Sequence, residues 1–254
     1  MEDDQETRMP LIGDMAPAFH AVTTQGEINF PQDYYGRWVI LFSHPADFTP
    51  VCTTEFMTFA SMMNEFKALG TELVGLSIDS IYSHIAWLRK IRELAWKDMK
   101  HVNVTFPLIA DITMEIAKKY GMLHPGCSVT QTVRAVFIID TEGMIRAILY
   151  YPASTGRNMQ EIKRMIIALQ KADCEKIATP ANWMPCDDVI LPPPGTCGAA
   201  MDRIESVNEN RYCLDWFLCF QQSECTTDCY NYEPEMNPYP SSFPVRSRYY
   251  YRNR

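Results

Sequence analysis

The sequence lacks the features that mark membrane-spanning, secreted and nucleic-acid-binding proteins. No stretch approaches the ~18 apolar residues of a spanning helix, and the acidic first ten residues lack the apolar run of a signal peptide. Lys and Arg number 23 against 31 Asp and Glu, a net charge of −8 that repels phosphate backbones and anionic lipids. We therefore expect a cytoplasmic protein with a small-molecule substrate and no nucleic-acid or membrane partner.

The nine cysteines also lack the usual paired motifs. The absence of C-x-x-C argues against an ordinary thioredoxin-type disulfide reductase and against a zinc knuckle. The odd count lacks the dense, even framework of a disulfide-rich secreted domain. We therefore expect no metal and no cofactor, and some of the thiols should be reactive or simply buried.

Apolar residues make up 47% of the chain, enough for a sizeable core. Residues 38–43 and 70–79 are continuous apolar runs typical of buried parallel strands, and the helical spacing over 53–69 completes a βαβ unit. Further predicted elements are a helix capped by Ser83, a strand over 105–111, a short helix over 114–120, a hairpin over 134–140 and 144–151, and a helix capped by Asn158. This pattern predicts an α/β fold with a central mixed sheet flanked by helices.

The composition changes after this α/β region. Five prolines between positions 180 and 194 interrupt regular structure, and the C-terminal end has no periodic apolar face. We predict three parts: an α/β domain over 1–174, a C-terminal extension arm over 175–229 and a disordered tail over 230–254.

Cys52 is the main candidate for chemistry. Thr49 suits the N-cap and Pro50 the first helical position, so Cys52 falls in the first turn of the predicted helix. Unpaired backbone N–H groups and the positive end of the helix dipole favour a thiolate there. A buried, inert thiol is the alternative, but open α/β sheets bind ligands at this edge. We expect Cys52 to be an activated nucleophile.

The residues around Cys52 resemble a known family. Pro45, Thr49 and Cys52 form the P-x-x-x-T-x-x-C signature of the peroxiredoxins, and HPADFTPVCTTE is similar to their active-site loop throughout. The similarity extends to LHPG at 123–126 and YYPASTGRN at 150–158, and resembles the subgroup of one-cysteine enzymes and their archaeal relatives. The resemblance implies a thioredoxin-like fold and a ring of dimers. The C-terminal arm is too broken by prolines and too aromatic to stand alone, so we expect it to reach a neighbouring subunit, with a homodimer as the minimum assembly.

The resemblance also implies the chemistry. A thiolate attacks the terminal oxygen of a hydroperoxide, and the cysteine becomes a sulfenic acid. By resemblance, Arg134 lies beside Cys52 and stabilises the developing charge, Thr49 hydrogen-bonds sulfur and peroxide, and Pro45 shields the site from water.

Arg157 and His44 are the further substrate-binding candidates. Arg157 matches a second family arginine, with a solvated loop charge as the alternative. For His44, a polar contact near the peroxide and a satisfied histidine at the end of a strand both remain open.

A second cysteine usually returns the sulfenic acid to thiol. The segment RYCLDWFLCF resembles the C-terminal arm of the archaeal members, and matching position favours Cys219 over Cys213 as the resolving thiol, with a thioredoxin-like dithiol as reductant. A spacing of six does not put these two cysteines on one helical face, so local pairing is not implied. Cys225 and Cys229 remain alternative resolving thiols. Together with Cys213 and Cys219 they could also form a metal site, which is the less favoured alternative.

The remaining cysteines match no family position, and we expect buried or incidental thiols: Cys127, Cys174, Cys186 and Cys197. The phospholipase serine of a related subgroup is absent from TTQGEINF, so no lipase activity is expected.

The sequence predicts a peroxidase that reduces hydrogen peroxide and organic hydroperoxides. A peroxide sensor or holdase using the same cysteine, and a metal-binding relative without catalysis, are the alternatives.

Overall fold

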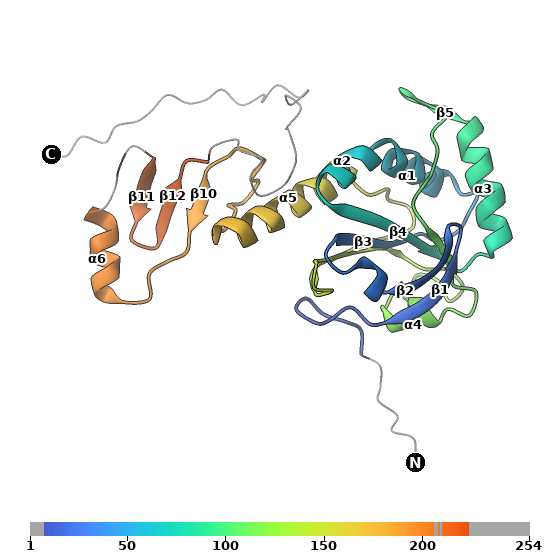
Figure 1. The fold of residues 1–254 in the computed structure, drawn as a ribbon, viewed down its shortest axis with the longest axis horizontal. Helices are drawn as coiled ribbons and strands as arrows, with labels where there is room; N and C mark the ends of the chain where they lie inside the picture. Colours follow the sequence, from blue (N-terminus) through green and yellow to red (C-terminus); the bar gives the residue numbers. More distant parts are fainter. Residues whose placement is uncertain (1–7, 206–207, 209, 224–254) are drawn as a thin grey trace, which may run out of the picture.

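The computed structural model describes residues 8–205, 208 and 210–223, and its main feature is a mixed sheet of seven strands. The strand order is β2-β1-β7-β4-β3-β8-β9 (Figure 1). β4 pairs in parallel with β3 and β7, whereas β8 pairs antiparallel with β3 and β9. The strands are β1 (Phe19–Thr23), β2 (Gly26–Phe30), β3 (Trp38–Ser43), β4 (Thr71–Ser77), β7 (Leu108–Ala110), β8 (Arg134–Ile139) and β9 (Ile145–Tyr151), besides a separate β5 (Ala95–Trp96) and β6 (Met99–Lys100) pair. The predicted mixed sheet is confirmed.

Helices cover both faces of this sheet. They are α1 (Pro50–Ser61), α2 (Met63–Ala68), α3 (Ile81–Glu93), α4 (Glu115–Lys119) and α5 (Met159–Glu175), with a short 3-10 helix η1 (Gln32–Tyr34). All of β3 is buried, and its side chains alternate between two cores. Phe42 packs with residues of α1, α2, α3 and α5, and Leu41 packs with α4 and the β1–β2 hairpin. Figure 1 shows α1 and α2 on one side of the sheet and α4 on the other.

Several predicted boundaries shift. The first helix begins at Pro50, as the Thr49–Pro50 start predicted, but the helical spacing that continued to Leu69 is interrupted at Met62. The N-cap of α3 is Ser80 rather than Ser83, since Ser80 Oγ accepts from the Ser83 N–H at 3.2 Å. The β1–β2 hairpin was not predicted from the sequence, because this edge hairpin is largely exposed and has no apolar run.

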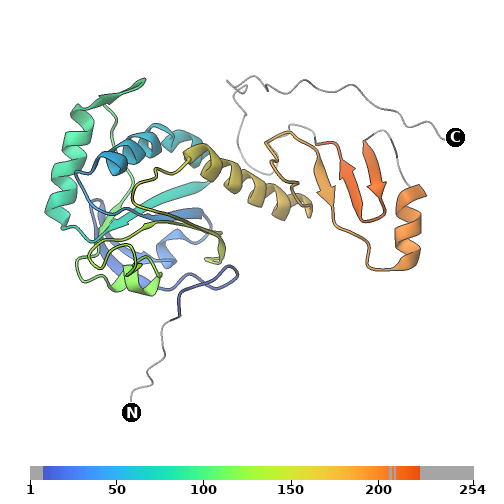
Figure 2. The same ribbon diagram turned by 180° about the vertical axis from the view of Figure 1, so that it is seen from behind.

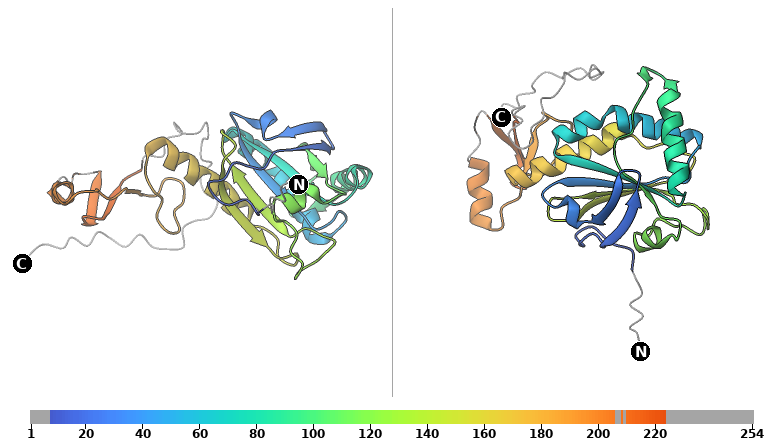
Figure 3. Two further views of the ribbon diagram at one scale, coloured as in Figure 1. Left: turned by 90° about the horizontal axis from the view of Figure 1, so that it is seen from below. Right: turned by 45° about the vertical axis from the view of Figure 1, so that its right-hand side comes forward.

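A second, smaller sheet beyond α5 was not predicted either. Its order is β10-β12-β11, from β10 (Val189–Leu191), β11 (Arg211–Asp215) and β12 (Leu218–Gln221), and α6 (Cys197–Glu205) lies beside it (Figure 2). Figures 1 and 3 place this sheet beyond the C-terminal end of α5, away from α1. The tail predicted over 230–254 lies outside the described residues. No described helix is both long and apolar enough to cross a bilayer.

Candidate active site

Cys52 lies in the first turn of α1, after the loop 44–49 that follows β3. Its side chain is fully buried. Thr49 is the N-cap residue and Pro50 the first residue of α1, but the Thr49 side chain makes no capping bond. Its hydroxyl instead donates to Ala46 O at 2.8 Å. The sulfur therefore sits at the positive end of the helix, in a loop closed by its own hydrogen bond.

Arg134, the first residue of β8, brings a positive charge to the sulfur. Its Nη1 donates to Cys52 Sγ at 3.2 Å, and its side chain is 2% exposed. Nε and Nη2 both donate to Ala153 O, at 3.1 and 2.7 Å. Ala153 follows β9, so the guanidinium is oriented by backbone from a different part of the chain. A guanidinium held at this distance stabilises a negatively charged sulfur.

Glu55, which was not predicted as a site residue, lies one helical turn after Cys52. Its Oε2 accepts from Arg134 Nη1 at 2.8 Å and from Arg157 Nη2 at 2.6 Å. Burial opposes ionisation of Glu55, but the charge and hydrogen bonds of Arg157, together with the charge of Arg134, outweigh it and hold the pKa of the carboxyl below its ordinary value. The sequence feature that could have indicated this role is that Glu55 is the single acidic residue among the buried positions of α1.

Arg157 is also fully enclosed. Besides its bonds from Nη2 and Nε to the Glu55 carboxylate, its Nη1 donates to Ser43 O at 3.0 Å and to Ala135 O at 3.1 Å. The alternative of a solvated loop charge is therefore wrong, since the side chain is 0% exposed. Most of its N–H groups are engaged by protein acceptors, which suits a role in holding Glu55.

His44 and Pro45 are buried at the start of the loop 44–49. His44 Nε2 lies 3.0 Å from Asp47 Oδ1, and Asp47 Oδ2 lies 2.8 Å from Nδ1 of His84 in α3. Burial lowers the pKa of His44, against the opposing influence of Asp47, so the neutral ring is favoured. Asp47 and His84 were not predicted from the sequence, because their contact joins the loop to a helix that follows only later in the chain.

Two family models match this chain. The AhpC/TSA family matches residues 12–148, and the C-terminal domain of 1-Cys peroxiredoxin matches residues 168–206. A peroxiredoxin of Methanosarcina mazei is 64% identical over 215 residues, which cover 84% of this chain and 98% of the relative. A peroxiredoxin of Aquifex aeolicus is 50% identical over 221 residues, covering 83% and 96%. The chain belongs to the peroxiredoxin family.

Solved peroxiredoxin structures resemble the fold of this peroxiredoxin. A yeast mitochondrial 1-Cys peroxiredoxin gives a TM-score of 0.72 at 39% identity, covering 85% of this chain and 100% of its own. Peroxiredoxin 6 of Arenicola marina gives 0.72 at 32% identity, covering 85% and 99%. The protein is therefore a thioredoxin-like peroxidase, an oxidoreductase that reduces peroxides through a cysteine.

The C-terminal cysteines of this peroxiredoxin are paired. Cys213 and Cys219 form a disulfide, and they lie opposite each other across β11 and β12. Helical spacing did not imply this local pair, but a hairpin brings residues six apart face to face. Cys225 and Cys229, the alternative resolving thiols, lie outside the described residues.

The four cysteines without a family position are in two different states. Cys174 and Cys186 are disulfide-bonded rather than free. Cys127 and Cys197 are free thiols, but they are exposed rather than buried. The expectation of buried or incidental thiols is therefore wrong for the paired Cys174 and Cys186, whereas the free, exposed Cys127 and Cys197 are compatible with incidental thiols.

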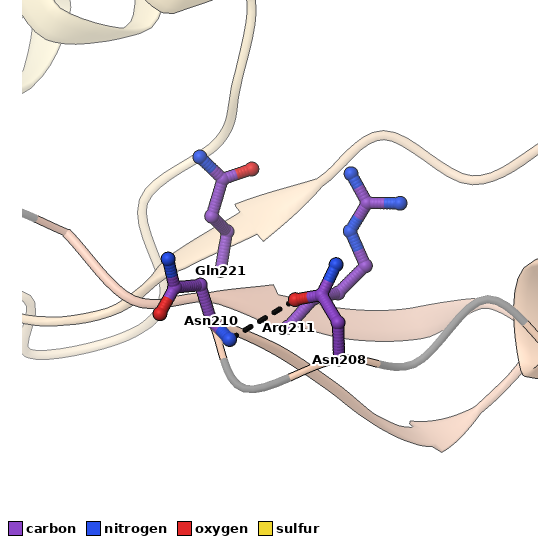
Figure 4. A pocket seen from close by; sticks show the side chains of 4 residues that line it. All are labelled: Asn208, Asn210, Arg211 and Gln221. Carbon is purple, nitrogen blue, oxygen red and sulfur yellow. Dashed lines mark hydrogen bonds between the residues drawn. The ribbon is translucent and has the colours of Figure 1, made fainter.

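Other features of the described chain offer little for catalysis. His44, Asp47 and Asp79 place potential metal ligands within 4.8 Å of one another, yet hydrogen bonds to His84, Ser77 and the backbone already engage their carboxylates. A hollow of about 460 Å³ lies on the small sheet, lined by Asn208, Asn210, Arg211 and Gln221 (Figure 4). It contains no thiol and belongs to the part of the fold remote from α1.

Proposed function

We propose that this peroxiredoxin reduces hydrogen peroxide and organic hydroperoxides at Cys52. The thiolate attacks the terminal oxygen of ROOH, the O–O bond breaks, and Cys52 becomes a sulfenic acid while the leaving oxygen takes a proton and departs as ROH or water. The 3.2 Å contact between Cys52 Sγ and Arg134 Nη1 carries the proposal. Negative charge spreads over both peroxide oxygens in the transition state, where a fixed guanidinium stabilises it.

The loop supplies the other proposed contacts. The Thr49 hydroxyl donates to Ala46 O, which leaves its oxygen able to accept from the peroxide O–H. Pro45 is buried and excludes water, and His44 provides a polar contact to the substrate. Arg157, predicted as a substrate contact, would act through Glu55, whose carboxylate it shares with Arg134.

We further propose that Cys219 resolves the sulfenic acid. A Cys219 thiolate attacks the Cys52 sulfur, a disulfide forms, and hydroxide leaves as water after protonation. Cys213 can then attack Cys219, which releases the Cys52 thiol and forms the Cys213–Cys219 disulfide. The cross-strand pairing of Cys213 and Cys219 supports this exchange.

The proposal requires a second subunit. Figures 1 and 3 place β12 beyond the far end of α5, so Cys219 of one chain is remote from its own α1. β9 is an edge strand of the large sheet and offers unpaired backbone groups to another copy. We therefore propose a homodimer, with a ring of dimers as its further assembly, in which the arm over 175–229 reaches the partner's site.

A thioredoxin-like dithiol is the proposed reductant of the final disulfide, and this recycling requires a reducing compartment, the cytoplasm. The yeast relative is described as resolving its thiol through glutathione and thioredoxin systems, which supports a thiol-based reductant. A peroxide sensor or holdase with the same cysteine is the second candidate. Repeated peroxide turnover with excess reductant separates it from a working peroxidase.

The deciding experiment is mass spectrometry under non-reducing conditions, after full reduction and one equivalent of hydrogen peroxide. Wild type should end with Cys213–Cys219 linked, and Cys213→Ser should trap a Cys52–Cys219 link between subunits. Cys219→Ser should stop at the Cys52 sulfenic acid. Absence of any Cys52 oxidation in wild type would contradict the peroxidase assignment to this residue, whereas a Cys52 that still ends in a disulfide in Cys219→Ser would contradict only the resolving role of Cys219.

A further inference from the structure

A buried chain of His44, Asp47 and His84 holds the loop 44–49 from behind. Asp47 Oδ1 faces His44 Nε2 at 3.0 Å, and Asp47 Oδ2 faces His84 Nδ1 at 2.8 Å. His84 Nε2 lies 3.1 Å from Ile109 O in β7. Both histidines are fully buried and Asp47 is 7% exposed. The loop is thereby tied to α3 and to the centre of the sheet.

The hydrogen-bond partners of the His44 and His84 ring nitrogens indicate which of these nitrogens carry a proton. A carboxylate and a backbone carbonyl only accept hydrogen bonds, so both contacts of His84 are satisfied only when its ring is the imidazolium. His44 donates through Nε2, and its buried Nδ1 has no partner among the described residues. These partners fit a positive His84, a negative Asp47 and a neutral His44 with a free Nδ1 lone pair.

The charges around His84 support this arrangement. Asp47 contacts it directly, the neutral His44 ring lies 6.3 Å away between centroids, and Asp79 accepts from the Asp47 backbone N–H at 3.0 Å. If His84 were neutral, the carboxylates of Asp47 and Asp79 would lie side by side in a largely buried environment. Asp47 would then have no cation in contact with it among the described residues. Buried charges are tolerated when paired in this way.

The loop also contains a strained residue. Phe48 has φ of +55°, in the left-handed region that non-glycine residues avoid, and its side chain is 58% exposed. Packing of the Phe48 ring therefore cannot hold this conformation. The hydrogen bonds of Asp47, the residue before Phe48, can hold it. The residue after Phe48 is Thr49, the N-cap of α1.

We propose that His84 is a positioning residue: its imidazolium fixes Asp47, and Asp47 fixes both the proton of His44 and the backbone that presents Thr49 to the Cys52 site. The inference rests on the proposed function of Cys52 for its kinetic consequence. The proton assignments do not depend on that function. If the His44–Asp47–His84 chain had only a structural role, substitutions in it would change the stability of the protein and not the rate of Cys52 oxidation.

The first test is nitrogen-15 NMR of the histidine rings in the full wild-type chain at neutral pH. We expect both ring nitrogens of His84 to be protonated, and His44 to be protonated at Nε2 only. A neutral His84, or a His44 proton on Nδ1, would overturn the proposal whatever the enzyme activity. Since no substitution is involved, this test cannot fail through misfolding.

The second test compares His84→Phe and His84→Gln, with His20→Gln on exposed β1 as the matched control. The rate of Cys52 oxidation should fall about 10- to 100-fold in His84→Phe, and less in His84→Gln, whose amide can still donate to Asp47. The His44 ring signals should change in parallel, and the control should match wild type. Each variant's urea unfolding is measured, so the rates refer to folded protein.

A folded His84→Gln or His84→Phe with the wild-type rate and unchanged His44 signals would refute the positioning role. If His84→Phe does not fold, His84→Gln and the wild-type NMR carry the decision. If wild-type Cys52 does not react with peroxide at all, the proposed function fails, while the proton assignments still stand or fall on the NMR. Titration with Zn²⁺ as a probe checks the competing interpretation, since metal binding at His44 would displace its Nε2 proton.

Discussion

Arg134 and Glu55 form an ion pair inside the protein, with 2.8 Å between Nη1 and Oε2, directly beside the Cys52 sulfur. Arg157 contacts the same carboxylate oxygen at 2.6 Å. Two guanidinium charges thus face one carboxylate, and one positive charge remains unbalanced within the group. A thiolate at Cys52 neutralises it, so the surroundings of the sulfur favour the reactive form.

Replacing Glu55 should destabilise the fold through this group. In Glu55→Ala, two buried guanidinium groups lose the carboxylate that they share, and the free energy of unfolding should fall by about 3 to 5 kcal/mol. Urea denaturation measures the change. Glu93→Gln, which alters an exposed glutamate of α3 paired with Lys90, should leave the unfolding curve unchanged. Equal curves for Glu55→Ala and wild type would contradict the importance of the buried pair.

The Thr49 hydroxyl should matter for rate rather than for stability. Thr49→Val keeps the shape but removes the hydroxyl, and we expect the second-order rate of Cys52 oxidation to fall about 100-fold. Thr49→Ser retains the hydroxyl and should stay near wild type. Stopped-flow measurement with hydrogen peroxide gives both rates. A fast Thr49→Val enzyme would show that the peroxide makes no contact there.

Acid should destabilise the protein through Asp47. Burial raises the pKa of this carboxyl, but the hydrogen bonds from His44 and His84 outweigh burial and lower it to about 2. An unfolded carboxyl titrates at about 3.9, so the unfolded chain binds more protons between these values, and stability is complete above this range and falls as pH falls through it. Urea unfolding between about pH 5 and pH 2 should show this loss. The slope should be smaller in Asp47→Asn, and an equal slope would assign the loss to other carboxyls.

Reduction of Cys213–Cys219 should loosen the small sheet locally. The disulfide closes a short loop across β11 and β12, with a sequence separation of 6, and such a loop contributes about 2 kcal/mol. Hydrogen exchange of the β11 and β12 amides should therefore accelerate after reduction. The amides of β3 in the same molecule serve as the internal control. Faster exchange in both sheets would indicate global unfolding instead.

The sequence identified the parts of the site that depend on local order. The apolar run of β3 and the Thr49–Pro50 start of α1 are properties of neighbouring residues, so the position of Cys52 in the first helical turn could be predicted. The resemblance to peroxiredoxins then pointed to Arg134, which lies 3.2 Å from the sulfur. The pairing of Cys213 with Cys219 was missed because their segment was not recognised as a hairpin.

The contacts that hold the site together depend on the tertiary structure. Glu55 meets Arg157 across 102 positions of sequence, and Asp47 meets His84 across 37. No local sequence pattern predicts either contact, because charges are buried only where folding brings a partner to them. The sequence by itself determined the fold class and the family, and it singled out Cys52 as the predicted reacting cysteine. Only the folded chain decided which charges surround that cysteine and which residues hold its loop in place.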